Sequence, residues 1–171
     1  MAITSNLKWN KEKDIWQLYN GEESLLSLGK KVKGQRPLFL ENRSFKISEK
    51  GSWNPTWYIE TERNEKILEM KFGFWSSKGK IRFQDGARYE CHFRNMSNLQ
   101  IIIYDLRYHE DLVSFQLETY EKGKARPKMV LHQKEVFTDK LLFLLGLGMS
   151  LFLQHYQEDA DFTTTFLLLT S

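Results

Sequence analysis

Apolar and polar residues alternate with a period of two along most of the first 133 residues. In Lys66–Phe74, for example, Leu68 and Met70 fall on one face, while Glu69 and Lys71 fall on the other. This alternation is typical of strands that bury one face and expose the other to water. The same pattern, or a short apolar run of similar length, predicts further strands at Asp14–Tyr19, Glu23–Leu28, Arg43–Glu49, Thr56–Thr61, Gly79–Gln84, Ala87–Arg94, Asn98–Asp105 and Leu112–Tyr120.

Pairs of residues that end in glycine lie between many of these segments. Glycine supplies the positive φ angle that tight hairpin turns need, so each pair predicts a turn. The pairs are Asn20-Gly21, Lys50-Gly51, Lys78-Gly79, Asp85-Gly86 and Lys122-Gly123. The sequence thus predicts roughly ten to twelve short strands at regular spacing, a pattern typical of a sandwich or a barrel.

The segment Leu141–Leu153 differs from everything before it, because it is apolar on all sides. Thr138 is suited to cap a helix and Asp139 suits the first turn, so a helix is predicted over about 138–156. A run of this length is too short for a membrane span, which needs roughly 20 residues. A helix that is apolar all round must then be enclosed by the rest of the protein.

Together, the two patterns predict a mainly β fold: a closed antiparallel barrel of roughly twelve strands that encloses one hydrophobic C-terminal helix. The apolar run is roughly 20 Å long as a helix, about the height of a barrel of tilted eight-residue strands. We expect a single domain over residues 1–171, with strands over about 7–133, the central helix, and a tail strand over about 162–169. The alternative is a helix packed between two sheets.

Two glycines inside the predicted helix indicate close packing against the barrel. Gly146 and Gly148 each cost about 1 kcal/mol in helix propensity. We therefore expect bulky inward side chains, such as Trp57 or Phe72, to lie close to the helix backbone.

Composition and charge narrow the chemistry only a little. The chain carries a net charge of +3 and one cysteine, Cys91, which excludes an intramolecular disulfide and is predicted to be buried. We expect the strand carboxylates, Glu60 among them, to face mostly outward, so no acid–base pair is predicted. No zinc motif, nucleotide-binding loop or nucleophile motif appears, and no metal or cofactor is expected. Most aromatic residues are predicted inside, which disfavours nucleic-acid binding; Trp53 and Trp75 are the candidates for exposure.

The predicted helix and the hairpins before it resemble one known group of proteins. The helix TDKLLFLLGLGMSLFLQHY (Thr138–Tyr156) and the hairpin GKIRFQDGARYECHF (Gly79–Phe93) are similar to those of the tubby C-terminal-like superfamily, which includes LURP-one-related proteins and phospholipid scramblases. The resemblance implies a twelve-strand barrel threaded by the helix, and a non-enzymatic role in contacting a membrane surface, a phosphoinositide or a protein partner. It does not extend to the scramblases' calcium site, because QKEVFTDK (Gln133–Lys140) lacks their Asp-rich segment.

Basic residues in two predicted loops are the candidate binding site. Lysine and arginine side chains at a loop donate charge-assisted hydrogen bonds to phosphate, so these loops are predicted to bind phosphate or anionic lipid headgroups. The alternative is that both are solvated turns that keep the protein soluble. The residues are Lys30, Lys31, Lys33 and Arg36 in the first loop, and Lys122, Lys124, Arg126 and Lys128 in the second.

A second functional hypothesis is a calycin-like or lipocalin-like carrier of a small apolar ligand. In that fold the helix packs outside the barrel and is amphipathic, unlike the helix predicted here. An outer-membrane barrel is disfavoured by the short strands and by an N-terminal stretch without an apolar signal segment. We therefore expect a cytoplasmic protein, peripheral to the membrane at most; the oligomeric state stays open.

Overall fold

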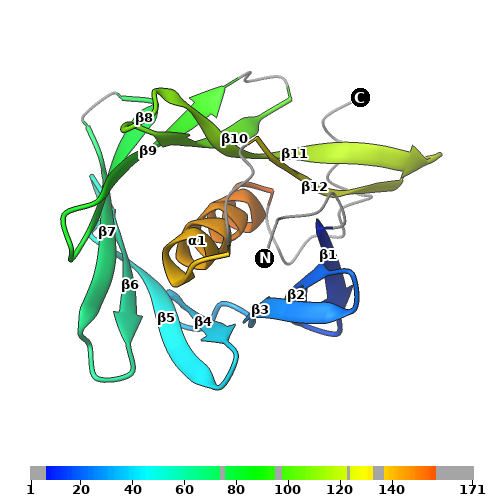
Figure 1. The fold of residues 1–171 in the computed structure, drawn as a ribbon, viewed down its shortest axis with the longest axis horizontal. Helices are drawn as coiled ribbons and strands as arrows, with labels where there is room; N and C mark the ends of the chain where they lie inside the picture. The colour runs from blue at the N-terminus through cyan, green and yellow to red at the C-terminus, as the bar shows by residue number, and fades with distance from the viewer. Residues whose placement is uncertain (1–6, 74–75, 95–97, 123, 133–136, 157–171) are drawn as a thin grey trace.

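The computed structural model describes residues 7–73, 76–94, 98–122, 124–132 and 137–156. Twelve antiparallel strands form a single sheet in chain order, and the sheet curls into a nearly closed barrel around one helix (Figure 1). The predicted fold class is therefore confirmed. The predicted tail strand over 162–169 lies outside the described residues.

Each strand pairs with the next one along the chain, so the barrel has an up-and-down topology. The strands are β1 (Leu7–Glu12), β2 (Ile15–Asn20), β3 (Glu23–Leu28), β4 (Gln35–Leu40), β5 (Arg43–Lys50), β6 (Thr56–Thr61), β7 (Lys66–Phe72), β8 (Lys78–Phe83), β9 (Arg88–Arg94), β10 (Gln100–Asp105), β11 (Glu110–Glu121) and β12 (Lys124–Leu131).

The first and last strands lie beside each other without joining the hydrogen-bonded ladder of the described strands. Between them, the Trp9 indole N–H donates to the Met129 sulfur at 3.4 Å. Side-chain packing therefore brings β1 and β12 together, and the barrel is nearly rather than fully closed.

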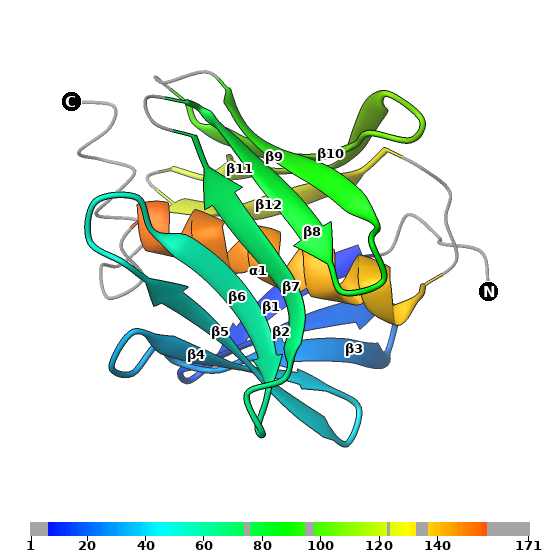
Figure 2. The same ribbon diagram turned by 90° about the vertical axis from the view of Figure 1, so that its left-hand side faces the viewer.

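The helix α1 (Asp139–His155) runs lengthwise through the barrel (Figure 2). Every residue from Phe143 to Leu153 is buried, and the helix packs against β3, β4, β10 and β11. The hydroxyl of Thr138 accepts a hydrogen bond from the Leu141 N–H at 3.2 Å, which confirms the predicted cap. The helix is apolar all round because the barrel wall surrounds it.

Side chains from the barrel wall lie close to the helix backbone at the two glycines, as predicted, but they are not the side chains that were expected. A Cβ on Gly146 would lie 3.1 Å from a Leu38 methyl, and a Cβ on Gly148 would lie 2.3 Å from the Phe115 ring. Trp57 and Phe72, the examples expected at this place, are not among the nearest atoms at either glycine, so that expectation was wrong for the two glycines. Phe72 instead covers Gly79, where an added Cβ would lie 3.0 Å from its ring.

Two predicted loops are in fact strand. Lys78 and Gly79 begin β8 rather than forming a turn, and glycine is needed at position 79 for packing, not for its φ angle. The segment Lys124–Leu131 is β12, which pairs with β11 throughout its length. Its Pro127 is tolerated because β12 ends the sheet order, where a missing backbone N–H interrupts no second ladder.

Candidate functional site

The up-and-down topology places alternate connections at opposite ends of the barrel. Every connection from an odd-numbered strand to the next even-numbered strand begins and finishes at one end: 13–14, 29–34, 51–55, 73–77, 95–99 and 122–123. The helix terminates at the same end, where the Lys31 ammonium donates to the Gln154 side-chain oxygen at 2.9 Å. We call this end of the barrel, formed by these six connections, the basic rim.

Charge is divided unequally between the two ends. The six connections of the basic rim contain five lysines and one acid: Lys13, Lys30, Lys31, Lys33 and Lys122, with Asp14. The five strand connections of the opposite end contain five acids and two arginines: Glu22, Glu41, Glu62, Glu65 and Asp85, with Arg63 and Arg107. The strand connections are therefore mostly positive at one end of the barrel and mostly negative at the other, and this difference favours oppositely charged partners at the two ends.

A tight hairpin presents two of the predicted lysines at the basic rim. The Val32 N–H donates to the Gln35 carbonyl at 2.8 Å, and the Gln35 N–H donates back at 3.0 Å. Lys33 and Gly34 between them have φ angles of 51° and 76°, the two positive values of a type I′ turn. Lys30 and Lys33 are both exposed, and Val32 between them is 59 % exposed.

Lys31 is in the same loop but is held against the protein. Besides its bond to Gln154, its ammonium lies 3.5 Å from a Glu49 carboxylate oxygen and 5.7 Å from the centre of the Trp57 ring. The glutamate also accepts from the Gln154 amide at 3.1 Å. These contacts of Lys31 connect the loop to the C-terminal end of the helix. They also hold the Lys31 ammonium in one position at the rim.

Arg36 was predicted as part of this surface loop, and that prediction was wrong. It is 2 % exposed and lies on β4, on the face that looks toward the helix. Its Nε–H donates to the Ser150 hydroxyl at 3.1 Å, and an Nη1–H donates to the Gly29 carbonyl at 2.9 Å. The strand period places Arg36 inward together with Leu38, so its charge joins strand to helix and does not reach the rim surface.

The second predicted cluster of basic residues does not lie in one loop: one residue is at the basic rim and three belong to a strand of the barrel wall. Lys122 lies exposed in the connection between β11 and β12, whereas Lys124, Arg126 and Lys128 belong to β12. Of these three, Arg126 and Lys128 contact the carboxylate of Glu118 at 3.1 and 3.6 Å. The hydrogen bond from Arg126 is the main cause of a lowered pKa at Glu118. These two cations are therefore part of an ion-pair cluster on the outer wall; the side chain of Lys124 lies outside the described atoms.

Trp53 is the most exposed large apolar side chain of the described residues, at 89 %. It lies in the connection 51–55, at the basic rim, so the prediction of an exposed tryptophan there is confirmed. Trp75, the other candidate, lies outside the described residues.

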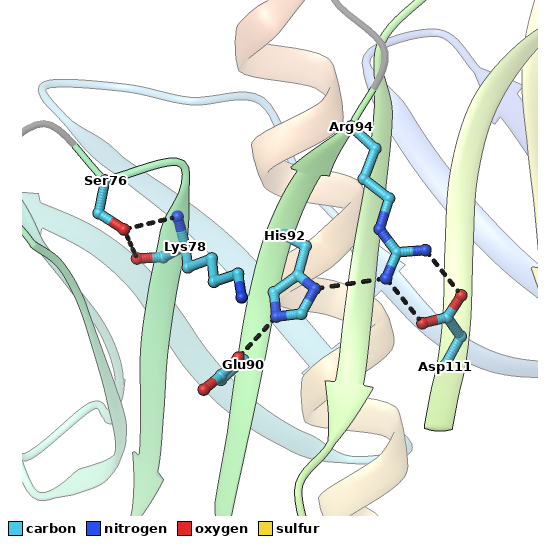
Figure 3. A network of polar contacts seen from close by, with 6 residues as sticks. All are labelled: Ser76, Lys78, Glu90, His92, Arg94 and Asp111. Carbon is cyan, nitrogen blue, oxygen red and sulfur yellow. Dashed lines mark hydrogen bonds and ion pairs between the residues drawn. The ribbon is translucent and has the colours of Figure 1, made fainter. Parts of the chain in front are cut away.

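A second polar cluster lies on the outer wall between β9 and β11 (Figure 3). The His92 Nε2 is 2.6 Å from a Glu90 carboxylate oxygen, and Arg94 forms two bonds of 3.1 Å to Asp111. Strand alternation alone places Glu90, His92 and Arg94 on one face, but Asp111 becomes visible only with the strand pairing. The Arg94–Asp111 ion pair ties β9 to β11 across β10, while the contact between Glu90 and His92 lies within β9.

Two further predictions concern single buried groups. Cys91 is fully buried, as predicted, and burial raises the pKa of its thiol to about 12. Glu60 was expected to face water but is 3 % exposed, with the Lys50 ammonium 3.2 Å from its carboxylate. Among the described residues, no group of three or more His, Cys, Asp or Glu side chains is placed to hold a metal ion.

The described part of the chain contains no helix with the length and apolar character needed to cross a membrane. No protein-family model, curated protein or solved structure matches the chain. The resemblance to the tubby-like superfamily therefore stays a prediction, and the geometry of the basic rim is the main indication of function.

Proposed function

We propose that this chain is a non-enzymatic binding module that docks on an anionic, phosphate-bearing lipid surface through the basic rim. The observation that supports it most directly is the gathering of five loop lysines at one end of the barrel, while the loop acids lie mainly at the other. Such a charge distribution attracts one end to an anionic surface and repels the other, so it favours end-on docking.

The expected strength follows from the exposed lysines. Each lysine near an anionic membrane contributes about 1 kcal/mol, and the effect falls off within a Debye length of about 8 Å at physiological salt. Lys30, Lys33 and Lys122 are exposed at the rim. Together they contribute about 3 kcal/mol, which is roughly a hundredfold in binding.

The enclosed helix supports a binding module over the carrier hypothesis. The apolar residues of α1 fill the centre of the barrel, where a lipocalin-like carrier would hold its ligand. Because the interior is already packed, binding through the loops and the outer wall is the arrangement that the fold favours. A peripheral membrane location follows from the proposal, and a cytoplasmic one stays a prediction.

Vesicle co-sedimentation tests this proposal. We expect wild-type protein to bind phosphatidylserine-containing vesicles at low salt and to release as the salt concentration rises, with weak binding to neutral phosphatidylcholine vesicles. Replacing Lys30, Lys33 and Lys122 by Gln should lower binding roughly a hundredfold. The matched control replaces three exposed cations near the opposite end, Arg63, Lys66 and Arg88, by Gln, with the same change in net charge.

Three outcomes contradict the proposal. No binding of the wild-type protein to anionic vesicles at low salt removes the lipid surface as partner. Equal losses in the rim variant and the control variant show attraction by net charge without a docking end. Equal binding to neutral and anionic vesicles shows that the rim lysines do not drive the binding, and it removes the electrostatic basis of the proposal.

A further inference from the structure

We infer that Trp53 is a membrane anchor: its indole inserts among the lipid headgroups once the rim lysines have brought the barrel to the bilayer. This inference rests on the proposed function, and it adds an apolar contact that a soluble phosphate compound does not offer. The bilayer is favoured as the partner because lysines surround the apolar side chains at this rim, as at many membrane interfaces.

The exposure of Trp53 contrasts with that of the other described tryptophans. Trp9, Trp16 and Trp57 are 7 %, 4 % and 5 % exposed, whereas Trp53 is 89 % exposed. A tryptophan has a large apolar body and one N–H donor, so it is most stable where one side is apolar and the other is wet. In water, the indole N–H is solvated but the apolar body of the side chain is not in apolar surroundings. The headgroup region of a bilayer offers water to the N–H and an apolar environment to the ring.

The loop around Trp53 is built for insertion at low cost. Residues 51–54, Gly-Ser-Trp-Asn, carry no charge, so no ion has to leave water when the loop enters the interface. Gly51 begins the loop with a φ angle of 100°, a backbone conformation that favours glycine. The base of the loop is fixed by Lys50, whose ammonium contacts Glu60 at 3.2 Å and lies 5.0 Å from the centre of the Tyr58 ring.

The neighbouring hairpin offers a second exposed apolar side chain. Val32 is 59 % exposed and directly precedes the Lys33-Gly34 turn in the connection between β3 and β4. The contact of Lys31 with Glu49 and its position over Trp57 tie this connection to β5 and β6, which flank the Trp53 loop. Lys30 and Lys33 beside Val32 are placed to meet lipid phosphates while the apolar side chains enter the interface. The barrel then stands with its basic rim against the membrane.

Fluorescence with brominated lipids tests the inference directly. Wild-type protein is mixed with anionic vesicles that carry bromine on the upper acyl chain, and the Trp53→Phe variant is measured in parallel. The difference between the two emission signals belongs to Trp53. We expect this difference to shift to the blue and to be quenched on vesicle binding, with no such change when inositol hexakisphosphate is added instead.

Binding measurements supply the second readout. Trp53→Ser should weaken vesicle binding about tenfold, since the interface loses one large apolar side chain. The salt dependence should stay that of the wild type, because no charge changes. The matched control is Tyr108→Ser, which removes an aromatic side chain that is 56 % exposed in the connection 106–109 at the opposite end, and which should leave binding unchanged.

The failures of the two proposals are distinguishable. If wild-type protein does not bind anionic vesicles, the proposed function fails and the anchor fails with it. If wild-type protein binds with the expected salt dependence but Trp53→Ser binds equally well, or the Trp53 signal is not quenched, only the anchor is overturned. Equal weakening by Tyr108→Ser also overturns it, because the effect would then not belong to the rim.

Discussion

Replacing Gly148 by Ala tests the central feature of the fold, the helix enclosed by the barrel. An added Cβ would lie 2.3 Å from one carbon of the Phe115 ring and 2.8 Å from the next. Carbon atoms pack comfortably at about 3.5–4.0 Å, so the ring must move by more than about 1 Å. Phe115 is 1 % exposed, and close packing around it resists such a shift.

The magnitude follows from two opposing contributions. Overpacking of this kind costs about 1–3 kcal/mol, and the overlap here favours the upper half of that range. The gain in helix propensity from Gly to Ala is about 1 kcal/mol. We expect a net loss of about 1–2 kcal/mol in the free energy of unfolding.

Gly146→Ala is the matched control. It makes the same change on the same helix and gains the same propensity. Its Cβ would lie 3.1 Å from Leu38 Cδ1, the movable end of a flexible side chain. The gain and the small cost should nearly cancel, so this variant should stay within about 1 kcal/mol of the wild type.

Urea unfolding of both variants, followed by circular dichroism, measures the difference. Gly148→Ala should unfold at a lower midpoint than Gly146→Ala, with an unchanged slope. Its melting temperature should be lower than that of the wild type by roughly 2–8 °C. Phe115→Leu combined with Gly148→Ala should cost less than the sum of the two single changes, because the smaller side chain relieves the overlap. If Gly148→Ala is as stable as Gly146→Ala, the helix does not lie against β11 as described.

Two further predictions separate structural charges from the rim charges. Arg36→Ala should lower the free energy of unfolding by about 3 kcal/mol, because the buried acceptors at Ser150 and Gly29 lose their donor. Vesicle binding by the folded variant should nevertheless equal that of the wild type. A loss of binding as large as that of the rim variant would contradict the buried position of Arg36. The hydrogen bond from Arg43 is the main cause of a lowered pKa at Asp139. In the pH range around this pKa the folded state therefore binds fewer protons than the unfolded state. The ion pair stabilises the fold above pH 3.8, the ordinary pKa of Asp, and this stabilisation is lost as the pH falls through the lowered pKa. The stability difference between wild type and Asp139→Asn, measured by urea unfolding, should therefore be about 0.5 kcal/mol at about pH 6 and should shrink as the pH falls below 3.8. A difference that does not depend on pH would remove the ion pair as its cause.

Local patterns were sufficient for most of the fold. The strands β2, β3, β5 to β9 and β11 were predicted from alternation and turn signals, and β10 was predicted from a short apolar run. In β10 the three consecutive residues Ile101, Ile102 and Ile103 are all buried. The helix was predicted to within one residue at each end, because an apolar segment with a capping threonine leaves few alternatives. Sequence alone failed where composition misleads: the lysines, glycine and proline before Met129 indicate a loop, but residues 124–128 pair with β11 and belong to a strand. Arg36 was misplaced for a related reason, since a charged residue near lysines suggests a surface, while its strand position turns it inward.

The basic rim shows why the sequence could not place the candidate site. Whether two loops share one end of an up-and-down barrel depends only on the number of strands between them being even. The connections after β3 and β11 are separated by eight strands, β4 to β11, so they share an end. The prediction of ten to twelve strands left that parity undetermined, and one strand more or fewer would have put Lys122 at the end opposite Lys30. The same parity explains the charge division. The loop lysines all lie in the connections 13–14, 29–34 and 122–123, which share one end, and the loop acids lie mainly in connections of the other set. Charges that are scattered along the chain therefore gather at opposite ends of the barrel.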